Sequence, residues 1–180
     1  CDPDIFILQQ LAVHGWSHRN HASAAEKKQE LGAQRPAATV LAELGAGLAK
    51  LRDLNGDKLD PLLVPPWNRI DGAVVEGLAS LGFEAVSVFG PERPGPLPAI
   101  NTHVDIIDWH GNRGCRDHAV LAGEIARQMR RAFEGESATT GVLTHHLVHD
   151  EAAWTFLETL LGITAEHPAC ARRQVRELMP

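Results

Sequence analysis

The chain has no tyrosine, few sulfur-containing residues and no long apolar run. Its 180 residues include only three cysteines and two methionines. Cys1, Cys115 and Cys170 are too few and too far apart for a disulfide framework or a four-cysteine zinc site. No apolar run approaches the ~20 residues that a helix needs to cross a bilayer. We therefore expect a soluble chain, or the soluble part of one, without structural disulfides.

Basic charge is also scarce. The formal net charge is −6, which argues against binding to nucleic acid or to an anionic membrane. Some arginines are clustered, but in stretches of helical pattern, where a solvated helix face is the simpler interpretation. These are Arg127, Arg130, Arg131, Arg172 and Arg173. We expect neither nucleic acid nor a membrane as partner, and the sequence leaves the oligomeric state open.

The sequence also lacks a starting methionine and a signal-peptide pattern. It begins at Cys1, so we expect a chain whose amino-terminal part is missing. The abundance of alanine, glycine and arginine, together with the lack of tyrosine, indicates a GC-rich bacterial genome. A cytoplasmic location is slightly favoured because no signal segment is visible, although such a segment upstream would have been lost with the missing part.

Strand-like and helical stretches alternate along the chain. Apolar runs predict strands over residues 5–13, 61–64, 83–90, 101–109 and 140–146. Three-to-four spacing predicts helices over residues 36–55, 71–81, 116–133 and 150–162, with a final helix from residue 165 onward. Residues 23–36 form a polar connector. The alternation predicts a single α/β domain over residues 1–180 with a largely parallel sheet.

Local signals support the ends of these helices. Pro36 suits the first turn of a helix, and Asp71 and Asp150 suit the position before one. Gly82 suits the position directly after a helix end. We assign Asp150 this capping role and no catalysis.

Polar clusters follow the predicted strands. They occupy residues 14–21, 67–69, 105–109 and 145–149, each at the carboxyl end of a strand. In α/β sheets and barrels the loops after the strands converge on one edge, and that edge carries the active site. The four clusters therefore predict one site.

Six of the ten histidines lie in two of these clusters. His14 and His18 are four residues apart, a separation at which two imidazoles can share one transition metal. A metalloprotease-type H-E-x-x-H motif is excluded, because Gly15 stands where the glutamate should be. The spacing by itself is weak, and the second cluster, with His145, His146 and His149, strengthens it.

Four motifs together resemble the polysaccharide deacetylase family, also called carbohydrate esterase family 4. The segments are similar to its H-[ST]-x-x-H, arginine-and-proline, D-x-x-D-W and L-x-H motifs, in the family's order, and they span residues 14–146. They read HGWSH, VPPWNR, VDIIDW and VLTHH. The resemblance implies a distorted (β/α) barrel of the glycoside hydrolase/deacetylase type, here incomplete at the amino terminus.

The family also implies a mechanism. A divalent metal, most often zinc, is held by two histidines and one aspartate, and activates a water that attacks an N-acetyl carbonyl. Carried over to this chain, His14 and His18 bind the metal. His145 protonates the leaving nitrogen, and Asp105 or Asp108 orients His145.

The remaining matched residues are implied to bind substrate. They are Pro66, Trp67, Arg69, Trp109 and Leu143. Leu143 is expected to line the pocket for the acetyl methyl group, and the tryptophans are expected to form apolar walls for a sugar ring. Arg69 is expected to pair with a site carboxylate. Trp154 is expected in the core, on the apolar side of its helix.

The chain departs from the family pattern at three points. Gly15 replaces a serine or threonine that normally braces the metal loop. His21 offers an alternative ligand pair with His18, although the His14 and His18 pair matches the motif. The paired aspartates of the first motif are absent, since only Asp2 and Asp4 precede His14.

Three functional hypotheses follow. The first is a metal-dependent hydrolase that removes N-acetyl or similar acyl groups from an amino sugar or polysaccharide, with Zn²⁺ as its expected cofactor. The alternative is a catalytically inactive carbohydrate-binding or metal-binding module of the same fold. The third is an unrelated α/β protein with histidine-rich surface loops.

Overall fold

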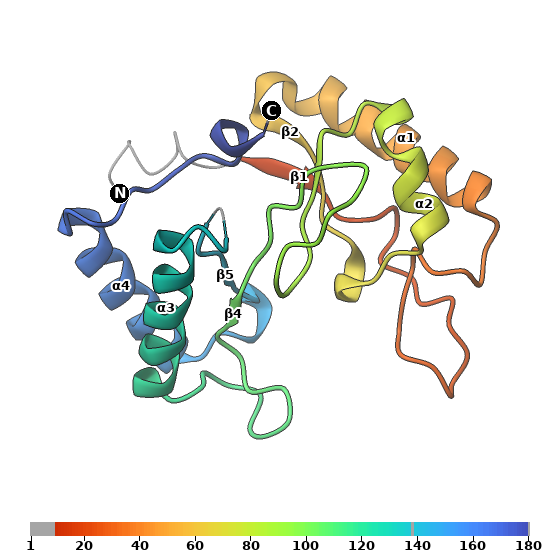
Figure 1. Cartoon of the computed structure of the whole chain (residues 1–180). Coiled ribbons are helices and arrows are strands. Elements are labelled where there is room, and N and C mark those ends of the chain that lie inside the picture. The colour runs from red at the N-terminus through yellow and green to blue at the C-terminus, as the bar shows by residue number, and fades with distance from the viewer. Residues whose placement is uncertain (1–9, 138, 180) are drawn as a thin grey trace. The chain divides into compact units, whose positions relative to one another are not determined.

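The computed structural model describes residues 10–137 and 139–179 (Figure 1). Contacts group them into two compact units. The described residues of Cys1–Val88, Glu92–Ile100 and Gln174–Pro180 form unit 1, and those of Phe89–Pro91 and Asn101–Arg173 form unit 2. No helix among the described residues is long and apolar enough to cross a membrane. The first half of the strand predicted over residues 5–13 lies outside the described residues.

Unit 1 is built on a parallel sheet with the strand order β1-β2-β3. The strands are β1 (Leu11–Val13), β2 (Leu59–Leu63) and β3 (Ala85–Val86). Pro61 lies inside the central strand β2, where a proline cannot donate to the ladder. The register between β1 and β2 shifts at this point, from Leu11 opposite Leu59 to Val13 opposite Leu63. This irregularity accommodates the proline within the sheet.

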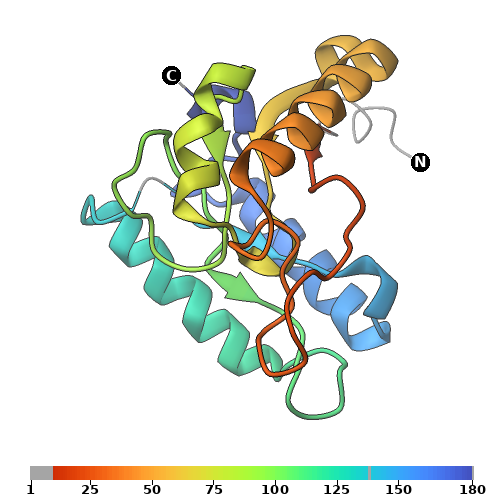
Figure 2. The same ribbon diagram turned by 90° about the vertical axis from the view of Figure 1, so that its right-hand side faces the viewer.

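Two helices of unit 1 lie side by side, α1 (Ala37–Asn55) and α2 (Gly72–Gly77) (Figure 2). Their predicted beginnings are confirmed. Pro36 directly precedes α1, and the Asp71 carboxylate caps α2 by accepting from the amide of Ala73 at 2.9 Å. A 3₁₀ turn (Ala79–Leu81) extends α2, and Gly82 follows it with a left-handed φ of 89°. A glycine adopts that conformation without a side-chain penalty.

The core of unit 1 joins both helices to the sheet. Leu44 and Leu48 of α1 are fully buried, because they lie one turn apart on the face turned toward the other elements. The buried cluster contains Val13, Leu31, Val40, Leu44, Leu48, Leu59, Leu63, Val74, Leu78 and Phe83. Leu31 belongs to the predicted polar connector, so that connector is not purely a surface loop.

Unit 2 contains a second parallel strand pair, β4 (Val104–Asp105) and β5 (Val142–Leu143). The strand predicted over residues 101–109 is much shorter than expected. Asp105 Oδ1 accepts from the amide of Ile107 at 2.9 Å, and this local side-chain bond turns the chain out of the ladder. A closed barrel stays a prediction; the described strands form these two parallel sheets.

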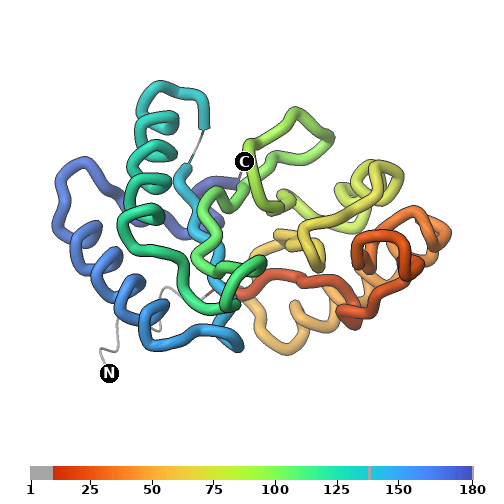
Figure 3. The backbone as a smooth tube through the Cα atoms, turned by 90° about the horizontal axis from the view of Figure 1, so that it is seen from below, coloured from red at the N-terminus to blue at the C-terminus, as the bar shows by residue number. Residues whose placement is uncertain are grey.

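Two helices of unit 2 lie side by side, α3 (His118–Phe133) and α4 (Glu151–Glu166) (Figure 3). The Asp150 carboxylate caps α4 by accepting from Ala153 at 2.8 Å, as predicted. It also accepts from the amide of Cys115 at 3.0 Å, and both bonds hold the pKa of Asp150 below its ordinary value. The buried cluster of this unit contains Val104, Ile106, Ile107, Leu121, Ile125, Ala153 and Phe156.

The prediction that Trp154 lies in the core is wrong. Its side chain is 56% exposed, whereas Ala153 and Phe156 are buried. Successive residues of a helix are rotated by 100°, so Trp154 projects to one side of the helix face on which Ala153 and Phe156 are buried. Trp154 lies instead against the ring of His149, with centroids 4.7 Å apart.

The prediction of a final helix from residue 165 onward is also wrong. Helix α4 ends at Glu166, and the only helical turn after it among the described residues is a 3₁₀ turn (Val175–Leu178). Pro168 follows the end of α4 and cannot continue it. Within unit 1, Arg176 contacts the buried Asp60 carboxylate at 3.1 Å. The segment is held by this tertiary contact rather than by helical periodicity.

Burial along α1 provides a matched test of the fold. We expect Leu48→Ala to lower the free energy of unfolding by about 2–5 kcal/mol, because it leaves a cavity in the core. Leu54→Ala, in the same helix, removes a side chain that is 69% exposed and should change it by no more than about 0.5 kcal/mol. Urea denaturation followed by circular dichroism measures both. Equal losses would contradict the described packing of α1.

Candidate functional site

His14 is the first residue after β1, and the neighbouring strand orients its ring. The amide of Val64 donates to the carbonyl of Val13 at 2.8 Å, which joins the ends of β1 and β2. His14 Nδ1 lies 2.8 Å from the carbonyl oxygen of Val64. A carbonyl only accepts hydrogen bonds, so Nδ1 carries the proton and Nε2 of the neutral ring is unprotonated. This is the arrangement in which metal-binding histidines are commonly held.

His18 lies beside His14 because the chain curls tightly between them. The ring centroids of His14 and His18 are 5.1 Å apart, and both residues are exposed. His18 has a left-handed φ of 53°, a conformation that costs a non-glycine residue free energy and persists only where its surroundings impose it. The structure therefore brings together the two imidazoles that the sequence predicted as ligands.

The ring of Trp67 also packs against His18. Their ring centroids are 4.2 Å apart. Trp67 and Asn68, in a 3₁₀ turn (Pro66–Asn68), have left-handed φ values of 55° and 57°. The predicted groove residue Pro66 is buried and lies against Gly15, where an added Cβ would come within 2.7 Å of Pro66 Cγ. The turn after β2 thus limits the space available to the histidine loop.

Arg69 was predicted to pair with a site carboxylate, but among the residues that the structure describes it pairs with none. It donates from Nη1 to the carbonyl of Lys28 at 3.0 Å. The contact ties the turn after β2 to the connector of residues 23–36, 41 residues away in the chain. The sequence carries no signal for this partner, because a backbone carbonyl is available at every residue.

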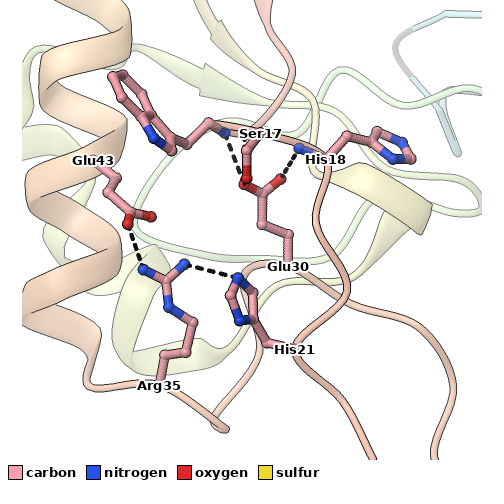
Figure 4. A network of polar contacts seen from close by, with 7 residues as sticks. Ser17, His18, His21, Glu30, Arg35 and Glu43 are labelled. Carbon is pink, nitrogen blue, oxygen red and sulfur yellow. Dashed lines mark hydrogen bonds and ion pairs between the residues drawn. The ribbon is translucent and has the colours of Figure 1, made fainter. Parts of the chain in front are cut away.

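His21 is held away from the role of metal ligand. Its Nε2 lies 3.4 Å from Nη1 of Arg35 (Figure 4). A guanidinium only donates, so His21 Nε2 must accept, and its lone pair is occupied. The Glu43 carboxylate forms an ion pair with Arg35 and raises the pKa of that guanidinium. This arrangement favours His14 over His21 as the partner of His18.

Glu30 is the residue that the sequence analysis missed. It lies in the predicted polar connector, yet it is 0% exposed. Its Oε1 accepts from the amides of Trp16 at 3.1 Å and Ser17 at 2.8 Å, and its Oε2 accepts from the amide of His18 at 3.0 Å (Figure 4). Connectors rich in charge rarely bury a carboxylate. The only signal nearby is Leu31, an apolar residue that anchors the connector in the core.

In unit 2, Asp105 and His145 are in direct contact. His145 Nε2 lies 3.2 Å from Asp105 Oδ2, and Trp109 donates from Nε1 to the same oxygen at 2.9 Å. The rings of Trp109 and His145 meet edge to face with centroids 4.8 Å apart. Leu143 lies opposite Asp105 in the register of β4 and β5. Four residues predicted for the site are therefore adjacent.

Asp108 serves a different purpose from Asp105. Its Oδ1 accepts from the amides of His110 at 3.3 Å and Gly111 at 2.9 Å, and its amide donates to the carbonyl of Gly114 at 2.9 Å. These bonds shape the loop after β4. Of the two carboxylates between which the sequence left the choice open, Asp105 is the one that contacts His145.

His149 supports the backbone of His145. Its Nε2 accepts from the amide of His145 at 3.1 Å, so the neutral ring carries its proton on Nδ1. Burial lowers the pKa of His149, and the nearby rings of His146 and His145 lower it further, against a smaller opposing effect of Asp150. His149 is therefore held in the neutral form that can accept this bond.

The imidazole pair of unit 1 fits the two histidine ligands of the expected metal site. His14 and His18 offer two nitrogen donors of the kind that zinc prefers. Within residues 10–137 and 139–179, no group of three histidine, cysteine, aspartate or glutamate side chains is placed to hold a metal ion. The described residues therefore fit the two histidine ligands of the expected site and do not supply its third ligand.

Comparison with known proteins adds no relative. The chain matches no protein-family model and no curated protein sequence. The resemblance to the polysaccharide deacetylases thus depends on the four sequence motifs alone.

The environment of His149 generates a pH prediction. Because its pKa is lower in the folded chain than the ordinary value of 6.5, protonation favours the unfolded chain. The stabilisation from neutral His149 is complete above this value and is lost as the pH falls through the folded pKa. We expect the stability to fall as the pH is lowered from about 7 toward the folded pKa, and less steeply in His149→Gln. Urea denaturation across this range measures it, and an NMR titration midpoint above 6.5 for His149 would contradict it.

Proposed function

We propose that the protein is a metal-dependent hydrolase that removes N-acetyl or similar acyl groups from an amino sugar or polysaccharide. The proposal assigns metal binding to His14 and His18 and proton delivery to His145. It takes Zn²⁺ as the cofactor and a distorted (β/α) barrel as the complete fold.

The geometry of His14 carries the proposal. The hydrogen bond from Nδ1 to the Val64 carbonyl leaves Nε2 with a lone pair that can bind a metal. The ring of His18 lies nearby, with the two ring centroids 5.1 Å apart. A divalent cation held by His14 and His18 would supply Lewis acidity toward an amide carbonyl and would make a water molecule more acidic at neutral pH. Both histidines are exposed, so a substrate amide can reach them.

The arrangement in unit 2 supports a role for His145 as general acid. An amine leaves an amide readily only if its nitrogen is protonated. The Asp105 carboxylate holds the proton on His145 Nε2, so a protonated ring delivers its other proton from Nδ1. Trp109 donates to the same carboxylate oxygen and fixes its direction.

Two tryptophans beside the candidate groups support a sugar as substrate. Trp109 is 43% exposed beside His145, and Trp67 lies against His18. The apolar face of an aromatic ring provides a flat surface for the C–H groups of a sugar, while its N–H remains available to a polar partner. Each candidate chemical group thus has an aromatic wall next to it.

Zinc binding is the first test of the proposal. We expect the wild-type chain to bind zinc in equilibrium dialysis against a zinc-containing buffer and a His14→Ala, His18→Ala double variant not to bind it, because the ligand pair is gone. His21→Ala is the matched control and should retain zinc, since Arg35 occupies that ring. Metal analysis of the dialysed proteins decides, and a double variant that keeps stoichiometric zinc would eliminate the proposed ligand pair.

Amine release from N-acetylated oligosaccharides tests the reaction. We expect release that a chelator abolishes and added zinc restores, and a loss of about 10²–10⁴-fold in Asp105→Asn, which turns an amide toward His145. The matched control is Asp117→Asn, which retains an oxygen to cap α3.

The outcomes of this assay separate the hypotheses. Release that does not respond to chelator would contradict the mechanism. Zinc and oligosaccharide binding without any release would favour the alternative, a catalytically inactive binding module of the same fold.

A further inference from the structure

We propose that Glu30 is the positioning residue of the metal-binding loop, holding the rings of His14 and His18 side by side. The inference rests on the proposed function, because it concerns the same pair of histidines. It assigns to the connector of residues 23–36 a part in metal affinity that its sequence does not indicate.

The contacts of Glu30 determine the path of the loop. Three consecutive amides, those of Trp16, Ser17 and His18, converge on its carboxylate at 2.8–3.1 Å, and the Ser17 hydroxyl lies 3.3 Å from Oε1. Consecutive amides can face one anion only if the chain curls around it, as in the backbone nests that bind anions. Here the anion is a side chain of the same protein. The curl places residue 18 beside residue 14.

Gly15 shows that the loop and the carboxylate are fitted to each other. It has a left-handed φ of 71°, and an added Cβ would lie 2.3 Å from Glu30 Oε2. Glu30 thus occupies the space that a side chain at position 15 would need. Any side chain there must displace the carboxylate, so Gly15 and Glu30 should act as a pair.

Glu30 is itself held from several sides. The amide of Gln29 donates to Asn20 Oδ1 at 3.0 Å, and Arg69 donates to the carbonyl of Lys28. Leu31 is 1% exposed, and its carbonyl accepts from the amide of Asp71 at 2.8 Å. The carboxylate therefore has a fixed position against which the loop is held, as a positioning group requires.

The strength of these bonds favours a positioning role over a passive one. Hydrogen bonds to an ionised acceptor are about twice as strong as those between neutral groups. Replacing the carboxylate by an amide removes the charge and turns N–H groups toward backbone donors. The loop should then open, and the two imidazoles should lose their common geometry while the rest of unit 1 stays folded.

The experiment compares Glu30→Gln with Glu26→Gln. Glu26 lies in the same connector but is exposed, and it bonds Ser23 and Gln34 instead of the histidine loop. Amide hydrogen exchange of the metal-free proteins reports the loop, and chelator competition reports the zinc dissociation constant. We expect Glu30→Gln to lose protection at residues 16–18 and to bind zinc about 10–100-fold more weakly. Glu26→Gln should match the wild type in both.

A second variant and a spectroscopic readout complete the test. Gly15→Ala places a Cβ against the same carboxylate and against Pro66, and it should also weaken zinc binding. If circular dichroism shows that Glu30→Gln does not fold, Gly15→Ala provides the test in its place. With Co²⁺ in place of zinc, the visible absorption should change in both variants, because it reports coordination geometry.

The possible failures are distinguishable. A folded Glu30→Gln variant with wild-type zinc affinity overturns the inference and leaves the proposed function standing. A wild-type chain that binds no zinc overturns the proposed function and the inference together.

Discussion

Parallel strand pairing is the constraint on which the candidate residues of each unit depend. In a parallel pair, neighbouring strands end at the same edge, so the residues that follow them meet. Val13 lies opposite Leu63, and His14, one residue later, contacts the carbonyl of Val64. In unit 2, Asp105 lies opposite Leu143, and the contact with His145 forms two residues beyond it. His14 thus follows a paired strand residue by one position, and His145 follows one by two positions.

In unit 1, pairing alone does not bring the second imidazole into place. The chain must reverse within four residues, and it does so with left-handed backbone at Gly15 and His18. For His18 that conformation costs on the order of 1–3 kcal/mol. The charged acceptor Glu30 offsets this cost, because it satisfies the amides that the curl turns inward. A buried residue of the connector thereby determines how two exposed histidines are presented.

Features with local causes were predictable, and features with distant partners were not. The caps of α2 and α4 follow from Asp71 and Asp150, since a capping side chain bonds an amide two or three residues away. Trp154 was misplaced because a broad apolar stripe does not show which edge the neighbouring elements cover. Arg69 was misassigned because its partner is a carbonyl from a distant segment. The motifs singled out the candidate residues without indicating which groups hold them in place.

The sequence by itself determined the α/β alternation, the beginnings of the main helices and the positions of the chemically capable side chains after the strands. These depend on periodicity and on bonds within a few residues. The tertiary structure alone decided that Asp105 rather than Asp108 contacts His145, and that the ring of His21 is taken by Arg35. It also decided that Glu30 is buried beneath the histidine loop. Such choices depend on which distant groups come within hydrogen-bond distance, and that is set by the packing of the elements and not by the order of the residues.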